Sequence, residues 1–342
     1  MNRVIIFAPN WLGDAVMALP AITDVRRGLP HGVVAVAARR SVAPLFGMVP
    51  AVDHVITIAK GARPLFFRVR ADCSADRHER RPRFDAAIIL PNSLHSALVA
   101  FRAGIPERWG YRSDCRGPLL TRPVDPAPAG THQIDCYQGL VNALGFPHVA
   151  AEPRLEVSAE VRDAAAALLT QAGWDGRQGL AALAPGAAYG SSKRWSPESF
   201  AALARALSAD ALLPILVGSA ADLATGSEIE AALEGATKIL NLIGQTDLPT
   251  LAGVLASARL TVSNDSGPAH LAAALGVPVT TLFGPSDERI VAPRPARPDR
   301  PAAVVTHPVW CRPCWLRECP LDHECMRGIR VDAVLNAARR MA

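Results

Sequence analysis

The stretch Arg259–Asp287 constrains the fold of this chain more than any other, because it has the pattern of a strand, a helix and a second strand. The short run Leu260–Ser263 is ended by the turn sequence Asn-Asp-Ser-Gly-Pro. The Ala- and Leu-rich run Ala269–Leu275 then has good helix propensity. The second apolar run, Val279–Phe283, completes the unit. We therefore predict one βαβ unit with parallel strands here.

The turn of this unit lies where a strand leads into a helix N-terminus. Asp265 or Ser266 can cap the helix, and Pro268 suits its first turn. Open α/β sheets bind ligands at the carboxyl ends of their strands, and a helix N-terminus offers N–H donors to phosphate. Gly267 would let the backbone approach a diphosphate closely. Taken alone, the stretch is more typical of a capped structural turn, so the phosphate interpretation depends on the rest of the chain.

Buried strands alternate with helices along the whole chain. The apolar runs that we expect to form strands are Val4–Ala8, Val33–Ala37, Val55–Ile58, Ala86–Leu90, Leu180–Ala184, Ile215–Val217 and Ile239–Leu242. Between Glu152 and Gly179 the composition turns to Pro, Ala and polar residues. We predict an α/β protein with a first domain over residues 1–160, a second over 175–330, and a C-terminal helix over 331–342.

The bulk composition excludes several classes of protein. With 342 residues, 50% of them hydrophobic, the chain is long enough for two globular domains, and its net charge of +5 is too small to indicate nucleic acid. The run Val4–Ala8 is too short for a signal peptide. Gly and Pro interrupt the longest uncharged stretch, Ser266–Ser286, so we expect no transmembrane helix. These features favour the cytoplasm, where the seven cysteines would be mostly reduced.

In the first half, Asp14 follows the first strand and lies at the start of the helix expected over Ala15–Arg27. The helix dipole favours the ionised carboxylate there, and a carboxylate so placed can take a proton from a substrate hydroxyl. The alternative is a simple N-cap, which is the commoner use of an Asp at this position.

A second polar turn follows the strand Ala86–Leu90. Asn92, Ser93 and Ser96 can hydrogen-bond sugar hydroxyls, or they can merely cap the following helix. Arg108, Tyr111, Arg112 and Arg116 lie close by in the sequence, and the guanidinium groups suit phosphate or carboxylate. The basic insert Lys60–Asp85 is either a solvated surface segment or a platform for an anionic acceptor at a membrane.

In the second half, the loop Pro185–Trp195 combines small residues with Lys193 and Arg194. Its spacing is not that of a P-loop, and no G-x-G-x-x-G follows the first strand. The loop therefore either binds an anion or is a flexible surface loop. Asp222 follows a later strand and can accept ribose hydroxyls or act as a cap.

Four cysteines crowd the C-terminal region, at Cys311, Cys314, Cys319 and Cys325. Their number resembles a metal-ligand cluster, but the paired C-x-x-C spacing of a common zinc ribbon is missing. We favour a reduced cysteine-rich loop over a structural metal site.

Together, these loops indicate a glycosyltransferase that uses a sugar nucleotide. The second half offers diphosphate-binding features, and the first half offers a carboxylate and hydroxyl-binding turns. No D-x-D motif occurs in the chain, so a metal-bridged diphosphate is unexpected. Positive charge from Lys193 and from the helix at Pro268 would then stabilise the leaving group.

Five segments resemble the bacterial ADP-heptose:lipopolysaccharide heptosyltransferases, in matching order over nearly the whole chain. They are PNWLGDAVMALPAI, LPNSLHSALVAFRAGIPERWGYR, PGAAYGSSKRWSPESF, NDSGPAHLAAALGVPVTTLFGPSD and CRPCWLRECPLDHECM. Within that family, the first, second and last resemble the branch that adds the second heptose of the inner core. The resemblance implies a GT-B fold of two Rossmann-like domains facing across a cleft. It also implies inverting transfer without a metal or another cofactor.

The resemblance also implies a role for individual residues. Asp14 matches the catalytic base, Lys193 the diphosphate-binding lysine, and Asp222 the acidic residue on the ribose. Asp265, Ser266, Gly267 and His270 match the segment that holds the sugar and the diphosphate.

The partners implied by the resemblance are ADP-heptose and a lipid-linked inner-core acceptor, heptosyl-Kdo2-lipid A, met at the cytoplasmic face of the inner membrane. Two alternatives stay open: transfer to another core acceptor, and a GT-B module that binds a nucleotide sugar without catalysis. The presence of Asp14 argues against the binding module.

Overall fold

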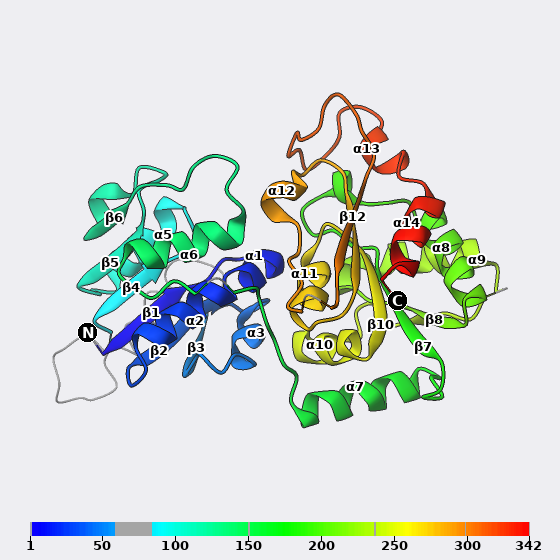
Figure 1. The fold of residues 1–342 in the computed structure, drawn as a ribbon, viewed down its shortest axis with the longest axis horizontal. Coiled ribbons are helices and arrows are strands. Elements are labelled where there is room, and N and C mark those ends of the chain that lie inside the picture. Colours follow the sequence, from blue (N-terminus) through cyan, green and yellow to red (C-terminus); the bar gives the residue numbers. More distant parts are fainter. Residues whose placement is uncertain (1, 59–83, 150, 236, 298, 342) are drawn as a thin grey trace. The chain divides into compact units, whose positions relative to one another are not determined.

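The chain forms two compact units, Met1–Glu152 and Pro153–Ala342, each built on its own sheet (Figure 1). The computed structural model describes residues 2–58, 84–149, 151–235, 237–297 and 299–341. Each unit contains a six-stranded sheet in which all the paired strands are parallel. The predicted α/β class is therefore confirmed.

The sheet of the first unit has the strand order β3-β2-β1-β4-β5-β6. Its strands are β1 (Arg3–Phe7), β2 (Val33–Arg39), β3 (His54–Ile58), β4 (Ala86–Ile89), β5 (Glu107–Tyr111) and β6 (Arg122–Val124). β1 is central, with Ile5 opposite Ala35 on one side and Ala87 on the other. Its buried, β-branched residues suit a strand covered on both faces. β5 contains Glu107 and Arg108, and β6 contains Arg122 and Pro123, so neither has the apolar run that predicts the other strands.

The helices of the first unit are α1 (Leu12–Met17), α2 (Leu19–Gly28), α3 (Ala43–Gly47), α5 (Leu94–Arg102) and α6 (Gln133–Ala143). The single helix predicted over Ala15–Arg27 is in fact two helices that meet at Ala18. The reason is Pro20, which has no N–H to donate and lies in the first turn of α2.

The sheet of the second unit has the order β12-β11-β10-β7-β8-β9. Its strands are β7 (Gly179–Ala184), β8 (Leu212–Leu216), β9 (Leu240–Asn241), β10 (Ala258–Asn264), β11 (Val279–Phe283) and β12 (Ala302–Thr306). β10 and β11 pair in parallel, with Thr261 opposite Val279, and α11 (Gly267–Ala274) connects them. The predicted βαβ unit at Arg259–Asp287 is therefore confirmed.

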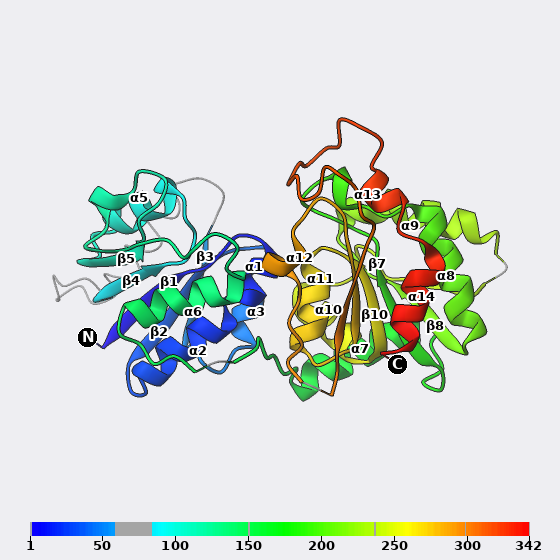
Figure 2. The same ribbon diagram turned by 45° about the horizontal axis from the view of Figure 1, so that its top comes forward.

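Helices cover both faces of this second sheet (Figures 1 and 2). α10 (Leu248–Ala256) and α11 lie on one face, whereas α8 (Pro197–Ala209), α9 (Leu223–Leu233) and α14 (Val331–Arg339) lie on the other. The remaining helices are α7 (Ala159–Gln171), α12 (Glu288–Val291) and α13 (Glu324–Arg327). In the core, the rings of Trp195 and Phe200 meet edge to face with centroids 5.1 Å apart. Because Trp195 is buried at the end of the Pro185–Trp195 loop, it fixes that end of the loop.

Both sheets have the doubly wound topology, in which the strand order reverses beside the first strand. β1 lies between β2 and β4, and β7 lies between β8 and β10. Ligands of such sheets bind at the carboxyl ends of the strands at this switch point. The loops after β1 and β4 in the first unit, and after β7 and β10 in the second, are therefore the candidate ligand-binding loops.

Among the described residues, no helix has both the length and the hydropathy needed to cross a membrane. The basic insert Lys60–Asp85 lies outside the described residues except for Phe84 and Asp85.

Candidate functional site

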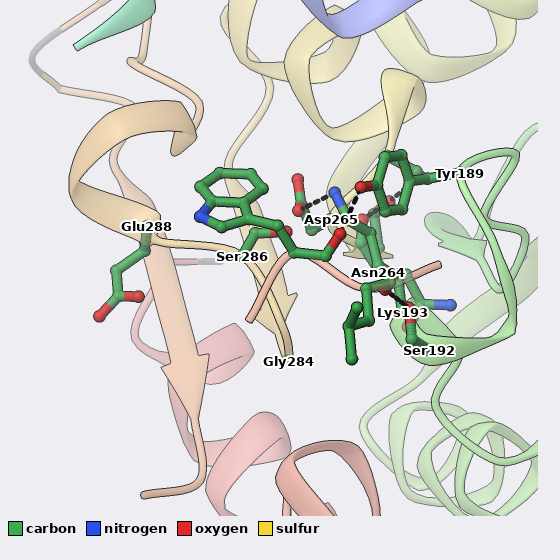
Figure 3. A network of polar contacts seen from close by, with 12 residues as sticks. Tyr189, Ser192, Lys193, Asn264, Asp265, Gly284, Ser286 and Glu288 are labelled. Carbon is green, nitrogen blue, oxygen red and sulfur yellow. Dashed lines mark hydrogen bonds and ion pairs between the residues drawn. The ribbon is translucent and has the colours of Figure 1, made fainter. Parts of the chain in front are cut away.

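The loop after β7 and the turn after β10 meet at the switch point of the second unit (Figure 3). Their side chains form an ion pair in which Lys193 Nζ lies 2.5 Å from Asp265 Oδ2. Both side chains are buried, with 10% and 5% of their surface exposed. The Lys193 ammonium also lies 4.7 Å from the ring centroid of Tyr189, where the π face attracts a cation. Two residues predicted from separate motifs are thus brought together.

Asn264 ties the two loops to each other. Its side-chain amide donates to Pro185 O at 2.6 Å and accepts from Trp195 N at 3.2 Å, so it holds both ends of the Lys193 loop. The side chain is fully buried, where an unmade hydrogen bond is costly. Asn264 therefore fixes the position of Lys193 relative to Asp265.

The helix α11 begins two residues after Asp265, which brings its positive end beside the ion pair. Ser266 occupies the N-cap position but makes no side-chain cap, and its hydroxyl lies 3.1 Å from that of Ser263. Of the two predicted capping residues, Ser266 is the N-cap residue, but its hydroxyl does not cap the helix, and Asp265 pairs with Lys193 instead. Gly267 is the first residue of α11, and His270 is buried one turn later.

Asp222 is buried and forms a capping box with Ser219 at the end of β8. One carboxylate oxygen accepts from the Ser219 N–H at 3.0 Å and from its hydroxyl at 2.8 Å. The other lies 3.9 Å from the Arg194 guanidinium. The structure therefore shows the capping role that the sequence left open, and the ribose-binding role stays a prediction.

In the first unit, Asp14 lies in the first turn of α1 and directly follows the β1 loop. The N-cap of this helix is Trp11, so the interpretation of Asp14 as an N-cap is wrong. Burial raises the pKa of the neighbouring Tyr137 phenol well above its usual value, and the negative charge of Asp14 raises it further. Asp14 thus lies at the switch point, within electrostatic range of a buried phenol.

The turn after β4 carries Asn92, Ser93 and Ser96. Ser93 is the N-cap of α5 and accepts from Ser96 N at 3.3 Å, while the Ser96 hydroxyl donates to Ser93 O at 2.6 Å. Ser93 therefore caps α5, the Ser96 hydroxyl donates to the backbone of the turn, and sugar binding by the turn stays a prediction.

The side chain of Arg116 stabilises the turn after β4 through hydrogen bonds. It is fully buried, and its guanidinium donates to Tyr111 O at 2.8 Å, to Pro91 O, and to Asn92 Oδ1 at 3.4 Å. Burial lowers the pKa of Arg116 to about 10. Its interpretation as a cation for a bound phosphate or carboxylate is therefore wrong, because backbone carbonyls and the Asn92 and Ser96 side chains occupy its donors.

The four C-terminal cysteines line one small cavity of about 70 Å³ in the second unit. They are free thiols. Within the described ranges, no group of three or more His, Cys, Asp or Glu side chains is arranged to hold a metal ion.

Comparisons with known proteins identify the family of this chain. The sequence model of glycosyltransferase family 9 (heptosyltransferase) matches residues 76–324. The chain is also 32% identical over 302 residues to lipopolysaccharide heptosyltransferase 2 of Escherichia coli (strain K12), with 85% of each protein covered. The chain belongs to glycosyltransferase family 9.

Solved structures extend the comparison to this family 9 chain as a whole. The structure of E. coli ADP-heptose lps heptosyltransferase II matches with a TM-score of 0.82 at 27% identity, covering 99% of this chain and 98% of the other. The structure of E. coli heptosyltransferase WaaC with ADP has the same fold, with a TM-score of 0.74 at 21% identity over 99% and 100% of the two chains. The predicted GT-B fold is therefore confirmed for this family 9 member.

Two residues of this candidate site went unrecognised in the sequence. Asn264 was read only as part of a turn, and Tyr189 only as part of a loop of small residues. The signal for Asn264 was its place at the very end of a buried strand, where a polar side chain needs a partner. No signal pointed to Tyr189, because its neighbours come from the distant C-terminal segment.

Proposed function

We propose that this chain transfers a heptose from ADP-L-glycero-D-manno-heptose to the first heptose of the lipopolysaccharide inner core, heptosyl-Kdo2-lipid A. The observation that carries the proposal is the buried Lys193–Asp265 pair beside the N-terminus of α11, at the switch point of the second unit. A cation and a helix N-terminus together suit a diphosphate. The 32% identity to an E. coli heptosyltransferase 2 supports the choice of donor and acceptor.

On the donor side, Lys193 and the N–H groups at the start of α11 bind the diphosphate of ADP-heptose. Asp265, Ser266, Gly267 and His270 contact the diphosphate and the heptose. Asp222 accepts a ribose hydroxyl through the edge of its carboxylate that faces Arg194. No D-x-D motif occurs in the sequence, so these groups, rather than a bridging metal, balance the charge that develops on ADP.

The reaction is a single displacement at the anomeric carbon. Asp14 takes the proton from a hydroxyl of the acceptor heptose as that oxygen forms the new glycosidic bond. The bond between the anomeric carbon and the diphosphate oxygen breaks, and ADP leaves with its electron pair. One displacement inverts the configuration. Asp14 lies in the first turn of α1, where the helix dipole favours a negative charge.

On the acceptor side, Asn92, Ser93 and Ser96 contribute hydrogen bonds to the sugar hydroxyls. The acceptor is a lipid, so the chain works in the cytoplasm in peripheral contact with the inner membrane. The basic insert Lys60–Asp85, with its surplus of Lys and Arg, would add attraction to an anionic surface.

The test uses purified chain, ADP-heptose and two acceptors, Kdo2-lipid A with and without one heptose, with the mass of the acceptor as readout. The proposal predicts a gain of one heptose only on the acceptor that already carries one. A gain on the bare acceptor would instead make this the first transferase of the core. No gain on either acceptor, with ADP-heptose still bound, would favour a binding module without catalysis.

A further inference from the structure

The cysteine-rich segment, residues 310–325, contacts the loop that carries Lys193 (Figure 3). The Tyr189 hydroxyl donates to Trp315 O at 2.6 Å, and the Ser192 hydroxyl donates to Leu316 O at 2.5 Å. The Ser192 N–H donates to Arg317 O at 3.1 Å. Three successive backbone carbonyls of the segment therefore accept hydrogen bonds from Tyr189 and Ser192. Both residues belong to the loop Pro185–Trp195, which we call the donor loop.

The backbone of Arg317 packs directly against Gly190. A Cβ at Gly190 would lie 2.1 Å from Arg317 O, so only glycine fits there. The Arg317 guanidinium lies 5.4 Å from the Tyr189 ring centroid, and Lys193 lies 4.7 Å from the same centroid. A displacement of the segment would therefore move Tyr189 and Ser192, and with them Lys193.

The other side of the segment is fixed to the loop after β11. Arg312 donates to Gly284 O at 2.5 Å and to Glu288 at 2.8 Å, and the N–H groups of Cys314 and Trp315 donate to Pro285 O. The segment thus bridges two strand-end loops of the donor unit, and it does so with almost no regular secondary structure of its own.

The four thiols of the segment lie next to the donor loop. The same cavity is lined by Cys311, Cys314, Cys319 and Cys325 and by Ser192 of the donor loop. Cys325 is buried, and burial raises the pKa of its thiol, with the three neighbouring cysteines raising it further. Cys311, Cys314 and Cys319 are only partly buried, so a reagent can reach them first.

We propose that the cysteine-rich segment positions Lys193 by holding Tyr189 and Ser192. We further propose that covalent modification of the thiols of this segment weakens binding of the nucleotide-sugar donor. The inference rests on the donor site proposed above. A maleimide is the probe: the thiolate adds to its double bond, a carbon–sulfur bond forms, and the neighbouring carbon takes a proton from water. The added ring enlarges a side chain in a small cavity, which forces the segment and the donor loop apart.

The first experiment measures maleimide labelling of each cysteine by peptide mass spectrometry, with and without saturating ADP. Labelling requires the segment to open away from the loop that carries Lys193, and bound ADP favours the closed arrangement, so ADP should slow labelling of Cys311, Cys314 and Cys319 by about threefold or more. Cys115 is exposed in the first unit and is the internal control, whose labelling should not change. Calorimetry should show at least about a fivefold weaker Kd for ADP after labelling, and no change when the four cysteines are first replaced by Ser.

The second experiment compares Ser192→Ala and Tyr189→Phe with the control Ser196→Ala. Ser196 caps α8 through Ser199 N and touches no residue of the segment among its described contacts. Losing one hydrogen bond that holds the loop should weaken ADP binding by roughly five- to tenfold in the first two variants, and less than about twofold in the control. The protection of the thiols by ADP should shrink in parallel, which a loss of stability alone would not produce.

Two results would overturn the inference. ADP that binds the unmodified chain without protecting the three thiols overturns it alone. An unmodified chain that binds no ADP overturns the donor assignment and this inference together.

Discussion

The ion pair of Lys193 and Asp265 makes a quantitative prediction about stability. The two charges are 2.5 Å apart and nearly excluded from water. With an effective dielectric constant of about 20, their attraction is roughly 7 kcal/mol. Desolvation costs several kcal/mol per ion and offsets most of this gain, so the intact pair contributes little net stability.

Removing one partner has a different result, because the remaining charge stays buried without its counterion. Lys193→Met and Asp265→Asn should each lower the free energy of unfolding by about 3–5 kcal/mol. The double variant removes both desolvation costs, so it should be more stable than either single variant. The coupling energy between the two sites should therefore be at least about 3 kcal/mol.

Urea unfolding of the four proteins, followed by circular dichroism, measures these differences. Heptose transfer should be lost in the double variant even though its stability recovers, since Lys193 is gone. Losses below about 1 kcal/mol in both single variants, or losses that simply add, would refute the reasoning, because the pair would then behave as a solvent-screened one.

Three further predictions follow from individual side chains. Asp14→Ala should lower turnover by roughly 100-fold or more and leave ADP affinity unchanged, as measured by product mass and calorimetry; turnover within about tenfold of the wild type would contradict its role as base. Burial raises the pKa of Tyr111 to about 12. Because this pKa lies above the unfolded-state value near 10, Tyr111 favours the folded state below pH 10. That contribution to the free energy of unfolding, at most about 3 kcal/mol, is lost as the pH rises through 12. Tyr111→Phe should flatten this fall in unfolding free energy, and an unchanged slope would contradict it. Asn264→Ala leaves Pro185 O and Trp195 N without partners and should cost about 2–4 kcal/mol and weaken ADP binding; a cost below about 0.5 kcal/mol in urea unfolding would contradict it.

The sequence was most informative where local signals agree with the topology. The βαβ unit around Gly267 has an apolar run, a turn, a helix former and a second apolar run in order, and each local choice supports the same fold. The placement of Asp14 and Asp265 after strands was also readable, because strand ends follow from the hydrophobic pattern. The doubly wound order then brings those strand ends to the switch points.

The sequence was least informative where long-range contacts decide. β5 and β6 lack an apolar run, yet they pair with the sheet, and Arg108 donates to Leu119 O while Arg122 stacks on Trp109. Arg116 likewise gave no local sign that it would be buried. The contacts of Tyr189 with Trp315 join residues 126 positions apart, which no periodicity can reveal.

The most direct test of the account is a crystal structure of the chain with ADP. The account predicts the diphosphate at the switch point of the second unit, against Lys193 and the N-terminus of α11, with the Lys193–Asp265 contact lengthened as the lysine turns toward the ligand. ADP bound at another edge of the sheet, with the ion pair undisturbed, would contradict it.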